Sequence, residues 1–367
     1  MRVHVLDPSA YTPPYDHALC TALGEAGVQV ELFTSRFAYG RTPAPISYTR
    51  REFFYERSHS PARIRRRSRA GLALKLAEHL PDMLRYRRAA QRAEIVHFQW
   101  LTVQPIDVHL LPRGRPLVLT AHDLLPREPR PGQLAAQRRL YERMDAIVVH
   151  SQHGRERLIS EHGVDRERIH VIPHGVLRPW EGLTEEPLPA QLCNVEGPVV
   201  LFFGLLRPYK GLDLLLDAWR GIDQAELWIV GMPRMDTAPL KTAAPANVRF
   251  LESFVPDEQI PAFMNRASFV VLPYREIEQS GVLFTALGAG APLLLSDAGG
   301  FPEVALSGAA RTFASGDPAA LGQELRKLLD ESAALAEMRR RGRAAAEADY
   351  SWGAIAHAHL DLYKRLL

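Results

Sequence analysis

The segment FFGLLRPYKGLDLLLDAW, residues 202–219, carries the clearest indication of the fold. It opens as an apolar strand ending at Gly204, continues through a short basic loop with Arg207 and Lys210, and becomes helical near Gly211. A strand that leads directly into a helix is the repeating unit of parallel α/β sheets. Two cations at the carboxyl end of a strand, beside a helix N-terminus, favour a diphosphate site. The alternative is a basic loop that binds no ligand.

The same alternation of apolar runs and helical patterns extends along the whole chain. The expected strands are 3–6, 28–33, 95–98, 116–121, 146–150 and 169–172 in the first half, and 199–203, 226–230, 248–251, 268–272 and 292–296 in the second. Such strands predict α/β parallel sheets covered by helices on both faces. Because the series runs twice, we expect two Rossmann-like, doubly wound domains that face each other across a cleft.

A polar, proline-bearing stretch at 177–198 separates the two series. We therefore expect an N-terminal, acceptor-side domain at 1–180 and a C-terminal domain for a nucleotide-sugar donor at 181–349. The helical pattern at 350–367 either closes the second domain or returns to the first, and the prediction adopted is a return to the first.

Composition narrows the class of protein. The chain has 367 residues, of which 46% are apolar and 24% charged, as in globular proteins of two domains. It opens on a strand-like alternation and has no apolar run of membrane-spanning length. Its two cysteines, Cys20 and Cys193, lie far apart and suggest neither disulfides nor zinc. These features favour a cytoplasmic protein.

A second informative segment is LPYREIEQSGVLFTALGAGAPLLLSDAGGFPEV, residues 272–304. A strand ends near Tyr274 and is followed by a loop with Glu276 and Glu278. Carboxylates at this point can accept hydrogen bonds from sugar hydroxyls. Either glutamate taken alone is equally consistent with an exposed loop side chain.

A helix is expected to begin directly after these carboxylates. Ser280 is a suitable N-cap residue, and Gly281 leaves room for a phosphate to approach the backbone amides of Val282 and Leu283. This helix N-terminus therefore joins the diphosphate site predicted from residues 202–219.

Together these segments resemble the retaining GT-B glycosyltransferases of family 4. The resemblance rests on Gly204, Arg207, Lys210 and Gly211, on the stretch 276–303, and on PHGV at 173–176, IVVHSQHGRERL at 147–158 and YSW at 350–352. It implies a UDP- or GDP-sugar donor, transfer with retention, a glycan, lipid-linked or small-molecule acceptor, and no cofactor. The family's first donor glutamate corresponds best to Glu276.

The sequence departs from the family pattern at two places. Leu205 follows the glycine where the family usually has arginine, and Arg207 comes two places later. Thr285 stands where the family's second glutamate holds the donor ribose. Glu278, Ser280 and Thr285 are accordingly assigned to the donor sugar or ribose, with weaker nucleotide binding as a consequence.

In the first domain, LTAHD at 119–123 places His122 at the end of a strand. The family often has a histidine here that contacts the donor sugar, so His122 is assigned, with Glu276, to the catalytic centre. Asp123 either orients the ring or caps a helix. Tyr15 and Asp16 occupy the place of the family's double glycine and are assigned to the acceptor side.

The chain contains no DxD motif, the usual chelator of a diphosphate-bound metal. We therefore expect no metal, with Arg207, Lys210 and helix amides stabilising the leaving diphosphate. Since no carboxylate is identified as a nucleophile, front-face departure is the favoured mechanism.

Three other classes of protein agree with part of this sequence. A nucleotide-sugar epimerase shares the architecture but requires acid and base groups around C2 of the sugar. An inactive GT-B binding module would account for Thr285, although it need not keep Arg207, Lys210 and His122. A nucleic-acid binder would rest on a basic stretch alone, without a recognisable module.

That basic stretch runs from Arg50 to Arg92 and contains 13 Lys or Arg against 4 Asp or Glu. Such a surface attracts phosphate groups, including those of anionic lipids. We expect peripheral contact with the inner face of an anionic membrane, with a merely arginine-rich composition as the alternative.

Overall fold

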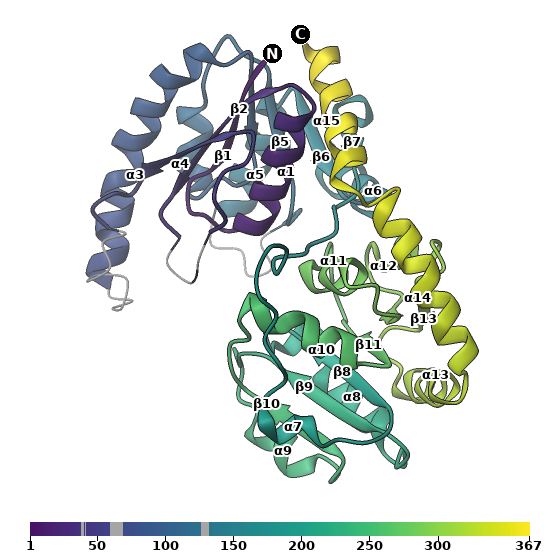
Figure 1. The fold of residues 1–367 in the computed structure, drawn as a ribbon. Coiled ribbons are helices and arrows are strands. Elements are labelled where there is room, and N and C mark those ends of the chain that lie inside the picture. The colour runs from purple at the N-terminus through teal and green to yellow at the C-terminus, as the bar shows by residue number, and fades with distance from the viewer. Residues whose placement is uncertain (38–39, 41, 59–68, 126–131) are drawn as a thin grey trace. The chain divides into compact units, whose positions relative to one another are not determined.

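The computed structural model describes the whole chain except residues 38, 39, 41, 59–68 and 126–131, and of residues 69–72 it describes only the backbone. The chain folds into two compact units (Figure 1). Unit 1 comprises Met1–Pro173 and Trp352–Leu367, and unit 2 comprises His174–Ser351. The first change of unit thus falls seven residues before the expected 180/181 boundary, and the second falls two residues after 349/350.

Within the described part of the chain, unit 1 contains a seven-stranded parallel sheet in the order β3-β2-β1-β4-β5-β6-β7. The strands are β1 (Arg2–Asp7), β2 (Gln29–Ser35), β3 (Thr49–Phe54), β4 (Ile95–Phe98), β5 (Leu117–Thr120), β6 (Ala146–Val149) and β7 (Ile169–Val171). The strand order reverses between β1 and β4. Ligands bind beside the carboxyl ends of the strands at such a reversal.

Helices cover both faces of this sheet (Figure 1). They are α1 (Pro13–Glu25), α3 (Arg69–Ala89), α4 (Gln104–Leu110), α5 (Gln133–Arg143), α6 (Gln152–His162) and α15 (Trp352–Leu366), with short 3-10 turns η1 (Ala90–Arg92) and η2 (Arg166–Arg168). The C-terminal helix α15 packs against α1 and buries Ile355 and Tyr363 in the same apolar cluster as Leu19. The last segment of the chain is therefore part of unit 1.

Unit 2 is built on a six-stranded parallel sheet in the order β10-β9-β8-β11-β12-β13, counted over described residues. Its strands are β8 (Val199–Phe203), β9 (Glu226–Val230), β10 (Val248–Leu251), β11 (Phe269–Leu272), β12 (Leu293–Ser296) and β13 (Ala310–Phe313). The carboxyl ends of β8 and β11 are neighbours, which brings together the two segments singled out by the sequence.

The helices of unit 2 surround one apolar core that includes Trp219, Trp228 and Phe263. They are α7 (Ala190–Cys193), α8 (Leu212–Trp219), α9 (Ala238–Ala243), α10 (Ile260–Arg266), α11 (Gly281–Gly288), α12 (Phe301–Ala305), α13 (Pro318–Asp330) and α14 (Ser332–Glu347), with 3-10 turns η3 (Pro208–Lys210) and η4 (Asp257–Gln259). No helix described in either unit has both the length and the apolar character needed to cross a bilayer.

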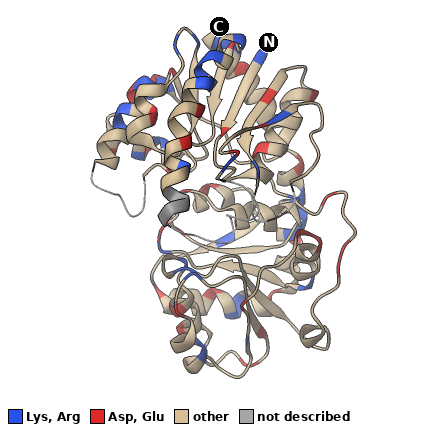
Figure 2. Ribbon diagram, turned by 90° about the vertical axis from the view of Figure 1, so that its left-hand side faces the viewer, with Lys and Arg blue, Asp and Glu red and all other residues tan. Residues whose placement is uncertain are grey.

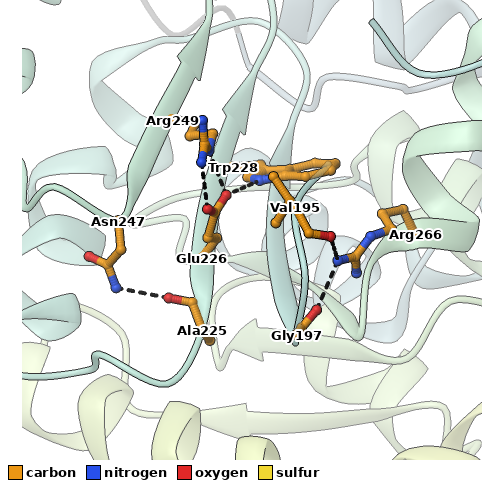
Figure 3. Close-up of polar contacts among 8 residues, drawn as sticks. All are labelled: Val195, Gly197, Ala225, Glu226, Trp228, Asn247, Arg249 and Arg266. Carbon is orange, nitrogen blue, oxygen red and sulfur yellow. Dashed lines mark hydrogen bonds and ion pairs between the residues drawn. The ribbon is translucent and has the colours of Figure 1, made fainter. Parts of the chain in front are cut away.

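Side chains near the β9–β10 edge fix the sheet of unit 2 at the amino ends of its strands (Figure 3). The Glu226 carboxylate accepts hydrogen bonds from Arg249 at 2.6 and 2.7 Å and from Trp228 Nε1 at 2.9 Å. The bond from Arg249 lowers the pKa of Glu226. Because this network lies at the opposite end of the strands from the predicted diphosphate site, it supports the sheet and leaves the other end to ligands.

Candidate active site

Gly204 determines the geometry of the loop that follows β8. Its φ of +102° lies in the region that only glycine adopts readily. A Cβ at this position would lie 2.8 Å from Val282 Cγ2 and 3.2 Å from Lys210 Nζ. The backbone of Gly204 therefore lies directly against both the Lys210 ammonium and the first turn of α11. The two segments predicted to share a diphosphate site do meet in space.

Lys210 is a buried cation, with a side chain only 5% exposed. Its Nζ lies 4.9 Å from the Tyr274 ring centroid and 5.9 Å from that of Phe202. Burying an ammonium is costly, and aromatic faces offset part of that cost. Gly211, at φ +69°, follows it and allows close approach to the Pro273 carbonyl, since a Cβ there would lie 2.1 Å from the oxygen. The chain thus holds a positive charge beside the amino end of a helix.

Arg207 lies on the same loop and is exposed. It occupies the position before η3 with an extended backbone, φ −136° and ψ 152°. Its side chain is therefore available to an anion near Lys210.

The first turn of α11 has the predicted cap. Ser280 has an extended backbone and its Oγ accepts a hydrogen bond from the Leu283 amide at 3.4 Å. Gly281 is exposed and Val282 is half-buried, so this end of the helix is open to a ligand. Helix amides in this position bind anions.

Thr285 directs its hydroxyl toward its own helix. The side chain is buried, and Oγ1 donates a hydrogen bond to the Gly281 carbonyl at 2.8 Å. The hydroxyl proton is therefore used in a hydrogen bond inside α11. Only the oxygen lone pairs remain available to accept a hydrogen bond from a nucleotide ribose.

The loop between β11 and α11 is anchored at its centre, between Glu276 and Glu278. Ile277 is buried, and its carbonyl lies so close to Gly299 that a Cβ there would be 1.7 Å from the oxygen. Glu276 is exposed and Glu278 is half-buried. Gly299 therefore packs against the loop that carries the two glutamates.

Sequence reasoning missed the ion pair that fixes this loop. Arg275 donates to both carboxylate oxygens of Asp213 in α8, at 2.9 and 2.6 Å, and its backbone amide donates to the Tyr209 carbonyl at 2.8 Å. The bond from Arg275 lowers the pKa of Asp213. The sequence does contain opposite charges at Asp213 and Arg275, each in a segment that follows a strand. It does not show that these two residues are neighbours in space.

In unit 1, His122 follows β5 and is half-buried among aromatic rings. Its ring stacks on Trp100, with centroids 5.1 Å apart and planes 15° apart, and meets the Tyr15 ring edge-on at 4.8 Å. Its Nε2 lies 3.0 Å from Gln99 Oε1 and its Nδ1 lies 3.3 Å from His150 Nε2. The orientation of the imidazole is therefore fixed from several sides.

The protonation state of His150 determines the direction of its hydrogen bond with His122. Its Nδ1 lies 3.0 Å from the Ile172 carbonyl and must donate to it, and burial lowers the pKa of His150 to about 4. At neutral pH His150 Nε2 is thus an acceptor, and His122 Nδ1 donates to it. The Gln99 side-chain amide contacts the other ring nitrogen of His122, Nε2, at 3.0 Å.

A buried chain of contacts connects this site to the C-terminal helix. His97 Nε2 lies 3.3 Å from Gln99 Nε2, and His97 Nδ1 lies 2.6 Å from the Tyr363 hydroxyl on α15. Burial lowers the pKa of His97 well below its usual value, so the ring is neutral. His97 therefore supports Gln99 without reaching solvent.

Tyr15 and Asp16, which the sequence assigned to the acceptor side, are almost fully buried. Tyr15 is 2% and Asp16 is 1% exposed, so neither side chain reaches the surface of unit 1. Asp16 lies against Asp7, and burial raises the pKa of both carboxyls. Asp7 in turn accepts a hydrogen bond from the Thr12 amide at 3.0 Å. The pair supports the loop after β1, and Tyr15 supports His122.

Among the described residues, no group of three or more His, Cys, Asp or Glu is arranged to hold a metal ion. The described groups of unit 2 that can stabilise a diphosphate are Lys210, Arg207 and the backbone amides at the start of α11.

Two family models match the chain, one on each unit. Residues 15–176 match the model described as Glycosyltransferase Family 4, and residues 197–331 match the model described as Glycosyl transferases group 1. The chain thus carries a glycosyltransferase domain in each half.

Curated relatives are similar over different lengths. The GDP-mannose:glycolipid 4-beta-D-mannosyltransferase of Xanthomonas campestris pv. campestris is 30% identical over 191 residues, which is 49% of this chain and 50% of the relative. The alpha-maltose-1-phosphate synthase of Mycolicibacterium smegmatis is 26% identical over 311 residues, 76% of this chain and 80% of the relative. The chain spans about half the length of the mannosyltransferases it matches.

Solved structures resemble the chain from end to end. Sucrose-phosphate synthase from Thermosynechococcus elongatus superposes with a TM-score of 0.76 at 19% identity and covers 100% of this chain and 99% of that one. HepE from Anabaena in complex with UDP-glucose gives 0.72 at 19% identity, with both chains covered completely. The fold is that of the GT-B glycosyltransferases, as the sequence predicted.

Proposed function

We propose that the protein is a glycosyltransferase that moves a sugar from a nucleotide-diphosphate sugar to an acceptor without a metal ion. The observation that carries this proposal is the contact of Gly204 with both Lys210 Nζ and Val282. It joins a buried ammonium to an open helix N-terminus at the carboxyl end of β8, where an α/β sheet binds phosphate.

In this proposal Lys210, Arg207 and the amides of residues 281–283 stabilise the diphosphate. Negative charge grows on the diphosphate as the bond to the sugar breaks. Fixed cations and dipoles that are already oriented stabilise that charge without reorganising. The burial of Lys210 strengthens the effect, because little water screens its charge.

Glu276 and Glu278 are proposed to accept hydrogen bonds from the donor sugar or ribose. Glu276 is the catalytic-centre candidate because it is exposed on the loop anchored by Ile277. Ser280 caps α11, and Thr285 bonds within it, so both hydroxyls chiefly support the helix. The base of the nucleotide is proposed to be uracil or guanine, which agrees with relatives whose names include GDP-mannose and UDP-glucose.

Transfer is proposed to proceed with retention, the leaving phosphate accepting the proton of the acceptor hydroxyl. The support for retention is the resemblance of the sequence motifs. The names of the relatives do not decide the stereochemistry, since one specifies a 4-beta-mannosyl transfer and another an alpha-maltose product. Asp123, exposed beside His122, provides the test. Asp123→Asn leaves the rate within about 10-fold if no protein base acts, and lowers it by about 1,000-fold or more in an inverting mechanism that uses this carboxylate as base.

The acceptor is proposed to be a glycan or a lipid-linked or small molecule, reached from an anionic membrane surface in the cytoplasm. Helix α3 carries the observation that favours the membrane. Its inner face buries Met83 and Tyr86, yet its outer face exposes Leu76, Leu80 and Leu84 at 48, 46 and 41%. Leucines spaced by four residues share one face of a helix, and such a stripe suits the interface of a lipid bilayer.

Helix α3 carries both basic and acidic residues (Figure 2). The carboxylates of Glu78 and Asp82 accept hydrogen bonds from backbone amides of the segment that follows β3. They are therefore directed toward the rest of unit 1. Arg88, near the C-terminal end, is exposed. Arg63, Arg65, Arg66 and Arg67 of the basic stretch lie outside the described residues, and so does the side chain of Arg69.

Thermal unfolding in the presence of nucleotides tests the donor site. UDP or GDP with EDTA should raise the Tm of the wild type, and Lys210→Met and Arg207→Ala should lose that rise. Arg220→Ala is the matched control, since Arg220 is an exposed cation of unit 2 paired with Asp217. A rise that needs a divalent ion, or that persists in Lys210→Met, would contradict the proposed site.

A further inference from the structure

Unit 1 contains a pocket of about 210 Å³ beside His122, at the carboxyl ends of β4 and β5 and against α4 and α5. The described residues that line it all belong to unit 1. Pockets for drug-sized ligands typically measure about 300–1,000 Å³, so this one suits a smaller molecule.

The described part of the pocket wall is polar and not basic. Besides His122 and Asp123, it contains the amides of Gln104, Gln133 and Gln137, and no Lys or Arg is among the described residues that line it. A phosphate or carboxylate ligand would need cations or clustered donors. The chemistry of this wall therefore fits a neutral molecule with several hydroxyl groups.

Gln137 provides the most specific indication of a ligand. Its side chain is 5% exposed, and its Oε1 has no hydrogen-bond partner within the part of the chain that the structure describes. A buried acceptor without a hydrogen-bond partner destabilises the folded protein. A ligand hydroxyl in the pocket would supply the missing donor. Gln133 Nε2, by contrast, donates to Gln104 Oε1 at 3.2 Å, which orders two further amides along the wall.

Aromatic surface completes the wall. Tyr11, 55% exposed, meets Trp100 edge-on with centroids 5.3 Å apart, and both rings line the pocket. Trp100 is held in place by a hydrogen bond from Nε1 to Thr12 Oγ1 at 2.9 Å. Amphipathic rings next to side-chain amides are the combination that sugar rings require, with apolar C–H faces and polar edges.

We propose that this pocket binds a neutral pyranose ring, the accepting end of the acceptor. The proposal rests on the proposed function and deepens it by naming the acceptor class: an uncharged sugar, and not a sugar phosphate or a polyol phosphate. The pocket is assigned to the acceptor because its described lining residues belong to unit 1, whereas the proposed diphosphate site belongs to unit 2. Asp123 would repel a phosphorylated acceptor.

Ligand-observed NMR saturation transfer on the intact protein without nucleotide tests this assignment. Methyl α-D-mannopyranoside and methyl β-D-glucopyranoside are the neutral probes, and myo-inositol 1-phosphate is the anionic one. At least one neutral pyranoside should show saturation transfer, and Gln137→Met should weaken its binding at least fivefold. Gln104→Met is a second pocket variant, and Gln91→Met, exposed in unit 1, is the matched control.

Stronger binding of the inositol phosphate, or equal binding of neutral sugar by Gln137→Met, Gln104→Met and wild type, would overturn the assignment. So would the absence of signal from both neutral sugars. The donor site is scored separately, because a nucleotide-induced rise in Tm depends on Lys210 and should be unchanged in Gln137→Met. If neutral sugars do not bind the wild type but nucleotides still raise its Tm, the acceptor assignment fails and the proposed donor site stands.

Discussion

Arg275 forms a two-pronged ion pair with Asp213, with N–O distances of 2.9 and 2.6 Å, and so ties the loop after β11 to the first turn of α8. Neither residue is a candidate for contact with the donor. Lys210 lies three residues before Asp213, and Glu276 directly follows Arg275, so the ion pair connects the two segments that carry a cation and a carboxylate assigned to the same substrate.

Breaking this pair should impair donor binding more than stability. Arg275→Ala should raise the KM for the sugar nucleotide about 5- to 10-fold, because the loop is displaced from its productive position. The unfolding free energy should fall by no more than about 1 kcal/mol, since the pair is partly exposed. Steady-state kinetics and urea unfolding check the two expectations. The charge-swapped double variant Arg275→Asp/Asp213→Arg should recover part of the KM, and failure of Arg275→Ala to change it would contradict this role.

Removing the Thr285 hydroxyl should have little effect on donor use. The hydroxyl donates to Gly281 within α11, so Thr285→Val should keep the donor KM within about twofold of wild type. Donor titrations at saturating acceptor measure this directly. An increase of 10-fold or more would mean that the hydroxyl contacts the ribose. Thr242→Val is a control, since Thr242 makes the same kind of bond, to the Ala238 carbonyl, in α9.

Buried neutral histidines should make unit 1 sensitive to acid. Burial lowers the pKa of His4, His150 and His359 to about 4, from the 6.5 of an exposed histidine. Between these values the unfolded chain binds more protons, so stability is full above pH 6.5 and declines as the pH falls toward 4. His359→Leu should flatten this decline in Tm, and His357→Leu, exposed on the same helix, should not. Parallel pH profiles for all three proteins would contradict the explanation.

Helix α3 should determine binding to anionic lipid. Leu80→Glu introduces a charge into the exposed leucine stripe and should abolish co-sedimentation with vesicles that contain phosphatidylglycerol. Leu306→Glu, 87% exposed in unit 2, should bind as wild type does. Equal binding of wild type to neutral and anionic vesicles would remove the membrane proposal.

Most of the fold could be predicted because buried parallel strands are continuous apolar runs. The expected strands 95–98, 199–203, 226–230 and 248–251 coincide with β4, β8, β9 and β10. The strands β3 (TRREFF) and β13 (ARTF) were missed. Both lie at sheet edges, where one side faces solvent and polar residues replace the apolar pattern.

The supporting contacts of the site could not be predicted because they join distant residues. His122 contacts Gln99, 23 positions away, and His97 contacts Tyr363, 266 positions away. No local pattern encodes such a pair. The capping role of Ser280, in contrast, was predictable, because the cap and the amide it bonds are three residues apart.

The most direct test of the central claim is release of nucleoside diphosphate from UDP- and GDP-sugars with EDTA present, with and without a neutral glycoside acceptor. The proposal predicts release that depends on the acceptor, survives EDTA and falls by about 100-fold or more in Lys210→Met. Lys241→Met, which changes an exposed lysine paired with Glu252, should retain full activity. Acceptor-independent conversion of the donor sugar to its epimer, or binding without any release, would contradict the account.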